Sequence, residues 1–233
     1  QEWIAADARN AEVLFPYLNG EDLNSRPDSS ASRWVIDFND RSSGEAAKYP
    51  QAFARLKDLV KPERQRLRPD GSFALRRPLP ERWWQYGEKR PAMRKAIANL
   101  QEVLVIARVS KTVMPLRVPT GQVMSEACVV FATDDYGDQA VLSSSLHQLW
   151  AITYGSGMRN DPRYTPSDVF ETFPRPIITD EVTQAGRGLD EERRNIMLRR
   201  GLGLTKVYNL VNDPKLDHSS DADIARLRQA HVN

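Results

Sequence analysis

Short β-branched and apolar runs, separated by Pro, Gly and Ser, occupy the middle of the chain. They predict four strands, near Val103–Val109, Val113–Val118, Gln122–Met124 and Cys128–Thr133. The turn Pro119-Thr120-Gly121 predicts a hairpin between the second and third of them. Polar side chains such as Arg, Lys, Ser, Thr and Gln alternate with the apolar ones. We therefore expect a strand platform that presents polar side chains on its surface.

Apolar residues at helical spacing lie on both sides of these strands. Before them, Pro50 suits the first turn of a helix whose apolar face carries Phe53, Leu56 and Val60, and Pro62 either kinks that helix or starts another. Pro91–Leu100 predicts a short helix. After the strands, a continuous apolar stripe predicts one helix over roughly Gln139–Tyr154, formed by Val141, Leu142, Leu146, Leu149 and Trp150.

The two ends of the chain differ in pattern. Near the N-terminus, Val13–Leu18 and Trp34–Phe38 predict strands, and the polar stretch Leu23–Ser32 between them predicts a loop. Beyond residue 176, Ile177–Gly188 has two Gly residues and little apolar content, and predicts a linker. Helical patterns then follow over Leu189–Arg200, Leu204–Asn212 and Asp221–His231.

These elements predict an α+β fold. Residues 1–176 would form one domain, with a mixed, mostly antiparallel sheet and flanking helices. After the linker 177–188, residues 189–233 would form a small helical region. A region of that size supports little core of its own, so we expect it to pack on the first domain.

Bulk composition narrows the class of protein. Of 233 residues, 40% are hydrophobic and 27% are charged, as in ordinary soluble globular proteins. No apolar run reaches the roughly 20 residues that cross a bilayer, and no signal-peptide pattern opens the chain. The lone Cys128 suits a buried small hydrophobe in a reducing, cytoplasmic setting. The chain begins with Gln1, which favours a segment of a longer protein.

Charge is distributed unevenly. Eleven basic residues and only four acidic ones lie between Lys61 and Lys95, a local excess of seven positive charges. Such asymmetry indicates a polyanionic partner, with a solvated basic surface as the alternative. Trp83 and Trp84 lie in the same region and either stack on bases or pack in a core.

Motifs for catalysis are missing from the sequence. Three histidines and one cysteine give no metal-ligand spacing, and the chain lacks a phosphate-binding loop, a dinucleotide fingerprint and a nucleophile elbow. Asp134-Asp135 lies in a turn, and Asp190-Glu191-Glu192 suits the first turn of a helix. Neither supplies the separated acid pair plus Lys of a metal-dependent nuclease. A Mg²⁺-dependent nuclease on Asp134 or Asp135 stays as a remote alternative.

Several motifs, in order, resemble the C-terminal half of the MmeI-like enzymes, the type IIL restriction-modification family. They cover almost the whole chain and are LFPYLNGEDLNS (Leu14–Ser25), SRWVIDF (Ser32–Phe38), YPQAFARLKDLVKPER (Tyr49–Arg64), WWQYGEKRP (Trp83–Pro91), VLVIARVSKT (Val103–Thr112), RYTPSDVFETFP (Arg163–Pro174) and the tail from Gly201 to Val232.

The resemblance implies a division of labour within a longer enzyme. In that family one polypeptide carries an endonuclease, an adenine-specific, S-adenosylmethionine-dependent DNA methyltransferase, and a target-recognition domain. Only the last part, with its helical appendage, is matched. We therefore expect double-stranded DNA and an upstream methyltransferase domain as partners, and no membrane. S-adenosylmethionine and Mg²⁺ would serve the parent enzyme, with no cofactor, metal ion or catalytic residue in this segment.

The resemblance also suggests which side chains contact DNA, because Arg108–Thr112 match the family's RVSKT motif. Arg and Lys pair with guanine, Gln and Asn with adenine, and Asp and Glu with cytosine. The alternative is a module that docks a methyltransferase on another protein without reading bases. The expected base readers are Arg108, Ser110, Lys111, Thr112, Arg117, Gln122, Asp134, Asp135 and Tyr136, and the expected phosphate contacts are Ser156, Arg159, Asn160 and Arg163.

Overall fold

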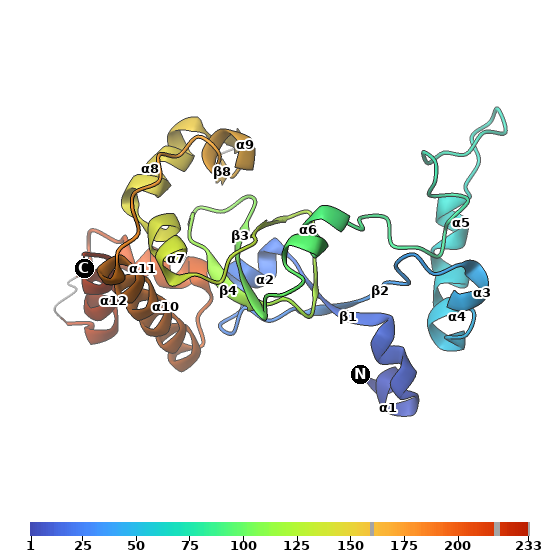
Figure 1. Ribbon diagram of the computed structural model, residues 1–233, viewed down its shortest axis with the longest axis horizontal. Coiled ribbons are helices and arrows are strands. Elements are labelled where there is room, and N and C mark those ends of the chain that lie inside the picture. The colour runs from blue at the N-terminus through green and yellow to red at the C-terminus, as the bar shows by residue number, and fades with distance from the viewer. Residues whose placement is uncertain (159–160, 217–219, 233) are drawn as a thin grey trace. The chain divides into compact units, whose positions relative to one another are not determined.

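The computed structural model describes residues 1–158, 161–216 and 220–232. The chain divides into two compact units, the first made of residues 1–16 and 33–91 and the second of residues 17–32 and 92–233 (Figure 1). Both units mix helices with short strands, so the expected α+β class is confirmed. No helix in the described part of the chain is long and apolar enough to cross a membrane.

The first unit packs small helices around an aromatic core. Phe38 is fully buried in it, and the ring of Phe53 lies 5.2 Å from the ring of Trp83. Trp83 and Trp84 meet edge to face, and the indole N–H of Trp84 donates to the Arg41 carbonyl. Of the two alternatives for this pair, core packing is the one the structure shows. The unit contains α1 (Glu2–Ala6), a 3-10 helix (Ala8–Glu12), the start of β1 (Leu14–Leu18), β2 (Arg33–Ile36), α3 (Ser43–Ala46), α4 (Pro50–Leu59) and α5 (Lys61–Arg64).

The helix expected from Pro50 is α4, with Pro50 in its first turn. At Pro62 a second short helix, α5, begins instead of a kinked continuation. Proline has no backbone N–H to donate, so it is tolerated in the first turn of a helix and breaks a helix interior. The sequence prediction is correct for both helices.

Most of the chain belongs to the second unit. Its central sheet has the strand order β4-β3-β6, with both pairs antiparallel, and β1 pairs in parallel with β5 through Tyr17 and Val123. The unit holds α2 (Gly20–Ser25), most of α6 (Pro91–Ala96), β3 (Glu102–Ala107), β4 (Leu116–Pro119), β5 (Val123–Met124), β6 (Cys128–Phe131), α7 (Tyr136–Ser143), α8 (Ser145–Tyr154), β7 (Ser156–Met158), β8 (Asp161–Arg163), α9 (Pro166–Val169), α10 (Asp180–Arg200), α11 (Leu204–Val211) and α12 (Ala222–Val232).

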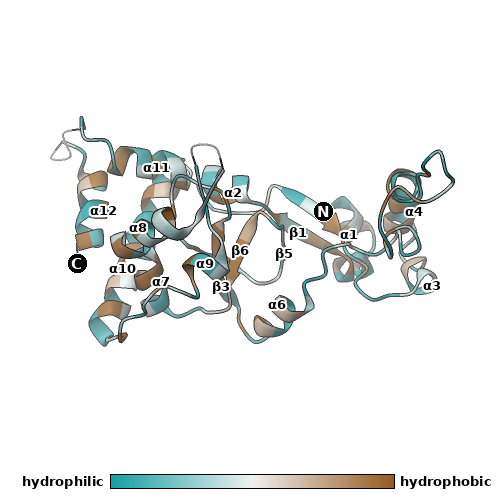
Figure 2. Cartoon of the chain, turned by 90° about the horizontal axis from the view of Figure 1, so that it is seen from above, coloured by the Kyte–Doolittle hydropathy of each residue, from teal (hydrophilic) through white to brown (hydrophobic). Residues whose placement is uncertain are grey.

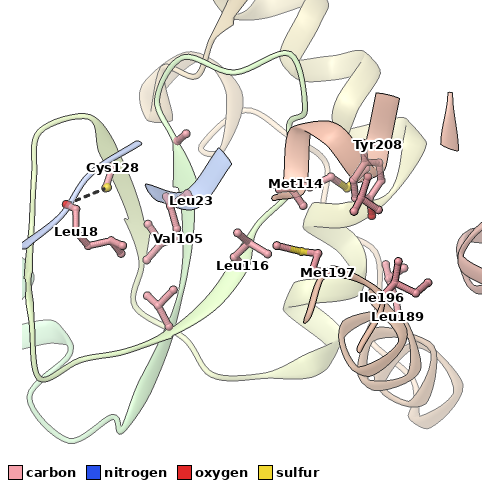
Figure 3. Packing of buried hydrophobic residues seen from close by; sticks show 14 of the residues in the cluster. Leu18, Leu23, Val105, Met114, Leu116, Cys128, Leu189, Ile196, Met197 and Tyr208 are labelled. Carbon is pink, nitrogen blue, oxygen red and sulfur yellow. Dashed lines mark hydrogen bonds between the residues drawn. The ribbon is translucent and has the colours of Figure 1, made fainter. Parts of the chain in front are cut away.

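Strand β3 is buried on both faces. Val105 packs in one cluster with Leu116, Met197 and Tyr208 (Figure 3), whereas Leu104 packs in another with the α7 residue Leu142. Figure 2 shows β3 and β6 as mainly apolar. Strands covered on both faces have nearly continuous apolar sequences, as this one does. The expectation of an exposed strand platform is therefore wrong for β3, which is core.

The hairpin expected at Pro119-Thr120-Gly121 is also wrong. Strand β4 pairs with β3, whereas β5 pairs with β1, so this turn connects two different sheets. Thr120 explains the change of direction, because its backbone N–H donates to the Gln101 carbonyl and its hydroxyl donates to the Leu100 carbonyl. These bonds hold the turn beside the start of β3.

The single helix expected over Gln139–Tyr154 is two helices, α7 and α8. Ser144 has an extended backbone between them, and its hydroxyl accepts from the backbone N–H of His147, which caps α8. A serine side chain competes well for helix N-termini, and it breaks the helix here despite the apolar pattern. The stripe is broken too, since Leu146 and Leu149 are 71% and 62% exposed.

Most of the linker expected over residues 177–188 is helix, because α10 already begins at Asp180. Gly186, which the sequence suggested as a linker residue, allows α10 and α7 to pack closely. A Cβ at this position would collide with the carbonyl oxygen of Tyr136, so only glycine lets α10 lie against α7. Helices α10, α11 and α12 share one hydrophobic core with β3 and β4, through residues such as Ile196, Val207 and Leu227.

The N-terminal part of the loop expected over Leu23–Ser32 lies in helix α2. Asn19 caps this helix, since its side-chain oxygen accepts from the backbone N–H groups of Glu21 and Asp22. Asp22 completes a capping box by accepting from the backbone N–H of Asn19. Leu23 is buried in the core. This capped turn places the start of α2 beside the loop between β5 and β6.

Candidate nucleic-acid interface

A depression of about 450 Å³ lies where four segments of the second unit meet. These segments are the start of α2, the residues after β3, the β5–β6 loop and the end of β8. Two arginines, two glutamates and an asparagine give it hydrogen-bond donors and acceptors of several kinds. It is lined by Gly20, Glu21, Asn24, Arg108, Val109, Glu126, Ala127 and Arg163.

Arg108 follows directly after β3 and is held by the β5–β6 loop. Its backbone N–H donates to the Ala127 carbonyl, and its Nε donates to the Glu126 carbonyl, both at 2.7 Å. The two terminal nitrogens of the guanidinium form no hydrogen bond or ion pair within the described residues. The hydrogen bond from Nε therefore orients the side chain, and the two terminal nitrogens stay available to donate to another partner.

The loop that carries Glu126 is held by hydrogen bonds to the end of β1. The backbone N–H of Ser125 donates to the Leu18 carbonyl, and its hydroxyl accepts from the N–H of Ala127. Cys128 donates its thiol to the same Leu18 carbonyl (Figure 3) and is buried, as expected. Glu126 itself is exposed. Glu126 was not among the residues expected from the sequence, although Ser125-Glu126-Ala127 is the polar break between two apolar strands.

Helix α2 supplies another wall of the depression. A Cβ on Gly20 would lie 3.2 Å from the Ala127 carbonyl oxygen, so glycine permits this close approach. Asn24, one turn further, accepts from the Ser110 hydroxyl at 2.9 Å. That bond occupies the amide oxygen and directs the Asn24 NH₂ group elsewhere. Asn24 is a second residue that the sequence analysis missed.

Ser110 and Thr112, both expected to read bases, are buried. Ser110 is 6% exposed, and besides bonding Asn24 its hydroxyl accepts from the backbone N–H of Thr112. Lys111 between them is exposed and makes no hydrogen bond or ion pair with residues that the structure describes. In the matched RVSKT segment, the two hydroxyl side chains are buried, whereas Lys111 is exposed and Arg108 is partly exposed.

The β7–β8 ribbon borders the depression and is anchored to the same segment. The Tyr164 N–H donates to the Arg108 carbonyl at 2.7 Å, and Val109 and Arg163 form a β-bridge. Arg163 pairs with Ser156 across the ribbon, and both are exposed. The ribbon therefore brings two expected phosphate contacts next to Arg108. The other two, Arg159 and Asn160, lie outside the described residues.

A buried histidine fixes the end of this ribbon that adjoins Arg163. The Tyr164 hydroxyl donates to Nε2 of His147, and Nδ1 of His147 donates to the Leu142 carbonyl, since a carbonyl can only accept. Burial lowers the pKa of His147 to about 4 and raises the pKa of Tyr164, so both stay neutral near pH 7. His147 therefore has a structural role.

The aromatic residues after the ribbon also anchor it. The Phe170 ring lies 5.1 Å from that of Phe131, and the Phe173 ring meets His147 edge to face.

Two other expected base readers, Arg117 and Tyr136, form a separate group at the junction of β4, α7 and α10. The Arg117 side chain is only 6% exposed, and it donates to the Asp134 carbonyl and to the side-chain oxygen of Gln139. Its guanidinium stacks on the Tyr136 ring, with 4.0 Å between carbon and ring centroid. Arg187 lies over the same ring at 4.3 Å. Arg117 is thus engaged within the fold.

The remaining expected readers are dispersed. Asp135 accepts from the backbone N–H of Asp138 as the N-cap of α7, and the Asp134 side chain is exposed. Gln122 donates to the Pro119 carbonyl within its own turn. Within the described ranges, no three His, Cys, Asp or Glu side chains are grouped so that they could hold a metal ion.

The family model for the MmeI target recognition domain matches residues 1–177. The chain belongs to the MmeI target recognition domain family. The membership that the sequence motifs suggested is thereby confirmed, and the depression lies within the matched range.

The target recognition domain is also similar in fold to a solved structure. That structure is the type IIL restriction-modification enzyme MmeI in complex with DNA. The two sequences are 16% identical, and the structures superpose with a TM-score of 0.57. The match covers 99% of this chain, including α10 to α12, and 28% of the MmeI chain. This chain therefore spans just over a quarter of the length of that enzyme. A comparison with curated proteins finds no match.

Proposed function

We propose that this chain recognises a specific double-stranded DNA sequence as the target-recognition part of a type II restriction-modification enzyme. Membership of the MmeI target recognition domain family, over residues 1–177, carries the proposal. The likeness to an MmeI structure that contains DNA supports it. The depression around Arg108 adds a surface with the right chemistry.

Base edges in the major groove differ in their donors and acceptors, and the depression offers partners for several of them. A guanidinium such as that of Arg108 donates to O6 and N7 of guanine. The Asn24 NH₂ group suits adenine N7, and the Glu126 carboxylate accepts from the amino group of cytosine. Lys111, Ser156 and Arg163 are exposed and suit phosphate oxygens.

The buried members of the expected set fit a supporting role better. In this proposal, Ser110 positions Asn24, and Thr112 fixes Ser110. Arg117 holds β4, α7 and α10 together. Contacts between DNA and Gln122, Asp134, Asp135 or Tyr136 stay predictions.

A second proposed role is docking beside other parts of the same enzyme. Helix α8 exposes Leu146, Leu149 and Ile152, and the first two line an apolar groove of about 780 Å³ formed with α10 and the end of α12. Exposed apolar patches of this kind mark protein interfaces. We propose an adenine-specific methyltransferase domain as this neighbour. S-adenosylmethionine and Mg²⁺ would be bound by such other parts, in the cytoplasm.

Selection from a random duplex library tests the function. The 233-residue chain is used to enrich duplexes at low salt, and the enriched pool is sequenced and titrated. We expect one enriched motif, bound more tightly than its scrambled version. A docking module that reads no bases would yield no enriched motif, and no binding at low salt would refute both base reading and phosphate contact.

A further inference from the structure

A basic hairpin leaves the helices of the first unit directly after α5 (Figure 1). Backbone hydrogen bonds between Arg68 and Ser72 and between Ala74 and Arg66 close it, and Gly71 takes the positive φ of the turn. Leu67 and Phe73 form a β-bridge in its middle. The segment between Arg66 and Ala74 therefore has defined structure.

Other basic side chains of the region from Lys61 to Lys95 have internal roles. The Arg64 guanidinium donates to three carbonyls, those of Arg82, Trp83 and Gln85. Lys61 lies over the Trp83 ring, and Lys89 pairs with Asp40 at 2.6 Å. These residues stabilise the unit and cannot offer their charge freely to a ligand.

The arginines of the hairpin differ from these. Arg66 and Arg76 are exposed and form no side-chain hydrogen bond or ion pair with any residue that the structure describes. Arg68 has only a 3.3 Å bond to the Ala74 carbonyl. Between Arg66 and Arg76 the sequence has three arginines and one acid, Asp70, which accepts from Ser72 within the turn and forms no ion pair with these arginines in the described structure. The hairpin therefore carries uncompensated positive charge.

The two faces of the hairpin differ in chemistry. Side chains alternate along a strand, so Leu67 and Phe73 share one face, and Arg66 and Arg68 share the other. Leu67 is 57% exposed and Phe73 is 38% exposed, so little core supports the hairpin. An isolated two-stranded hairpin is marginally stable in water. A poorly supported hairpin with free arginines is the kind of element that a bound ligand completes.

We propose that Arg66 and Arg68 of this hairpin bind the phosphate backbone of DNA without reading its sequence, as a site separate from the depression in the second unit. This inference rests on the proposed function, because double-stranded DNA is the polyanion that the arginines would bind. Guanidinium groups suit phosphate oxygens because their donors form a planar fork. The apolar face would remain free to pack against sugar carbons.

The salt dependence of binding tests this site. Each phosphate contact contributes about 0.9 to the slope of log affinity against log salt. The slope is negative, and the double variant Arg66→Ala/Arg68→Ala should therefore make it shallower by about 2 on a duplex of random sequence. Between about 50 and 200 mM salt, the affinity of the wild type should fall roughly tenfold more than that of the variant.

The control variant Arg9→Ala/Arg26→Ala removes the same net charge. Arg9 already pairs with Asp7 at 2.7 Å, and Arg26 pairs with Asp28 at 3.5 Å, so this slope should stay at the wild-type value. Circular dichroism melts confirm that both variants fold. An unchanged slope in the hairpin variant, or an equal change in the control, would overturn the proposal. Wild-type chain that binds no duplex would instead refute the proposed function itself.

Discussion

Replacing Arg117 by alanine should destabilise the second unit without changing which DNA bases the chain prefers. The variant leaves the side-chain oxygen of the fully buried Gln139 without its donor, which costs about 1–3 kcal/mol. Loss of the stacked Tyr136 contact adds about 0.5–2 kcal/mol. Asp190 keeps Arg193 at 2.9 Å, so no buried charge is orphaned. We expect a loss of roughly 2–4 kcal/mol.

Differential scanning calorimetry measures this loss. A domain of this size loses about 2–4 °C of melting temperature for each kcal/mol of unfolding free energy that is lost. The melting temperature should therefore fall by about 5–15 °C. The control Lys111→Ala removes an exposed cation and should change stability by less than about 0.5 kcal/mol. A variant that melts like the wild type but loses its base preference would make Arg117 a base reader and refute the division into two groups.

Three further changes test other parts of the structure. Gly186→Ala should destabilise the fold by about 1–3 kcal/mol because its Cβ collides with Tyr136, whereas Gly188→Ala, with open space around it in the same helix, should stabilise it by roughly 0.5–1 kcal/mol in urea titrations. The pKa of His147 is about 4 when folded and about 6.5 when unfolded, so the unfolded state binds more protons between these values. Falling pH should therefore shrink the stability difference between wild type and His147→Gln, and a constant difference would contradict the burial of a neutral imidazole. Ser110→Ala should weaken binding of the selected DNA motif by about 1 kcal/mol through Asn24, with little effect on scrambled DNA in anisotropy titrations.

The sequence predicted correctly those helices and strands whose determinants lie within the segment itself. Pro50 and its apolar face located α4, and the run from Val103 to Ala107 located β3. The helical patterns over Leu204–Asn212 and Asp221–His231 located α11 and α12. In each case one segment of sequence contains both the signal and its cause.

Errors arose where a distant residue decides the outcome. Gly186 resembles a linker residue until the Tyr136 carbonyl is placed beside it, and Thr120 turns the chain because it bonds carbonyls near residue 100. Whether Arg117 points outward or inward depends on Gln139 and Asp190, which lie on later helices. Residue type alone therefore identified side chains with suitable chemistry for DNA, but could not separate exposed side chains from buried ones.

The same reason explains the missed residues. Asn24 and Glu126 lie on segments far apart in sequence and adjoin Arg108 only in the folded chain. Neither belongs to a basic or strand-like pattern. Their relation to the site comes from the depression itself, which no single stretch of sequence encodes.

Base selection with an Arg108 variant tests the central claim most directly. The duplex selection is performed in parallel with wild type and Arg108→Ala, and each enriched motif is compared position by position. If the depression reads bases, one position should lose its preference, with a cost of about 1–3 kcal/mol on the wild-type motif and far less on scrambled DNA. An unchanged motif, or an equal loss on both duplexes, would show that Arg108 does not read sequence.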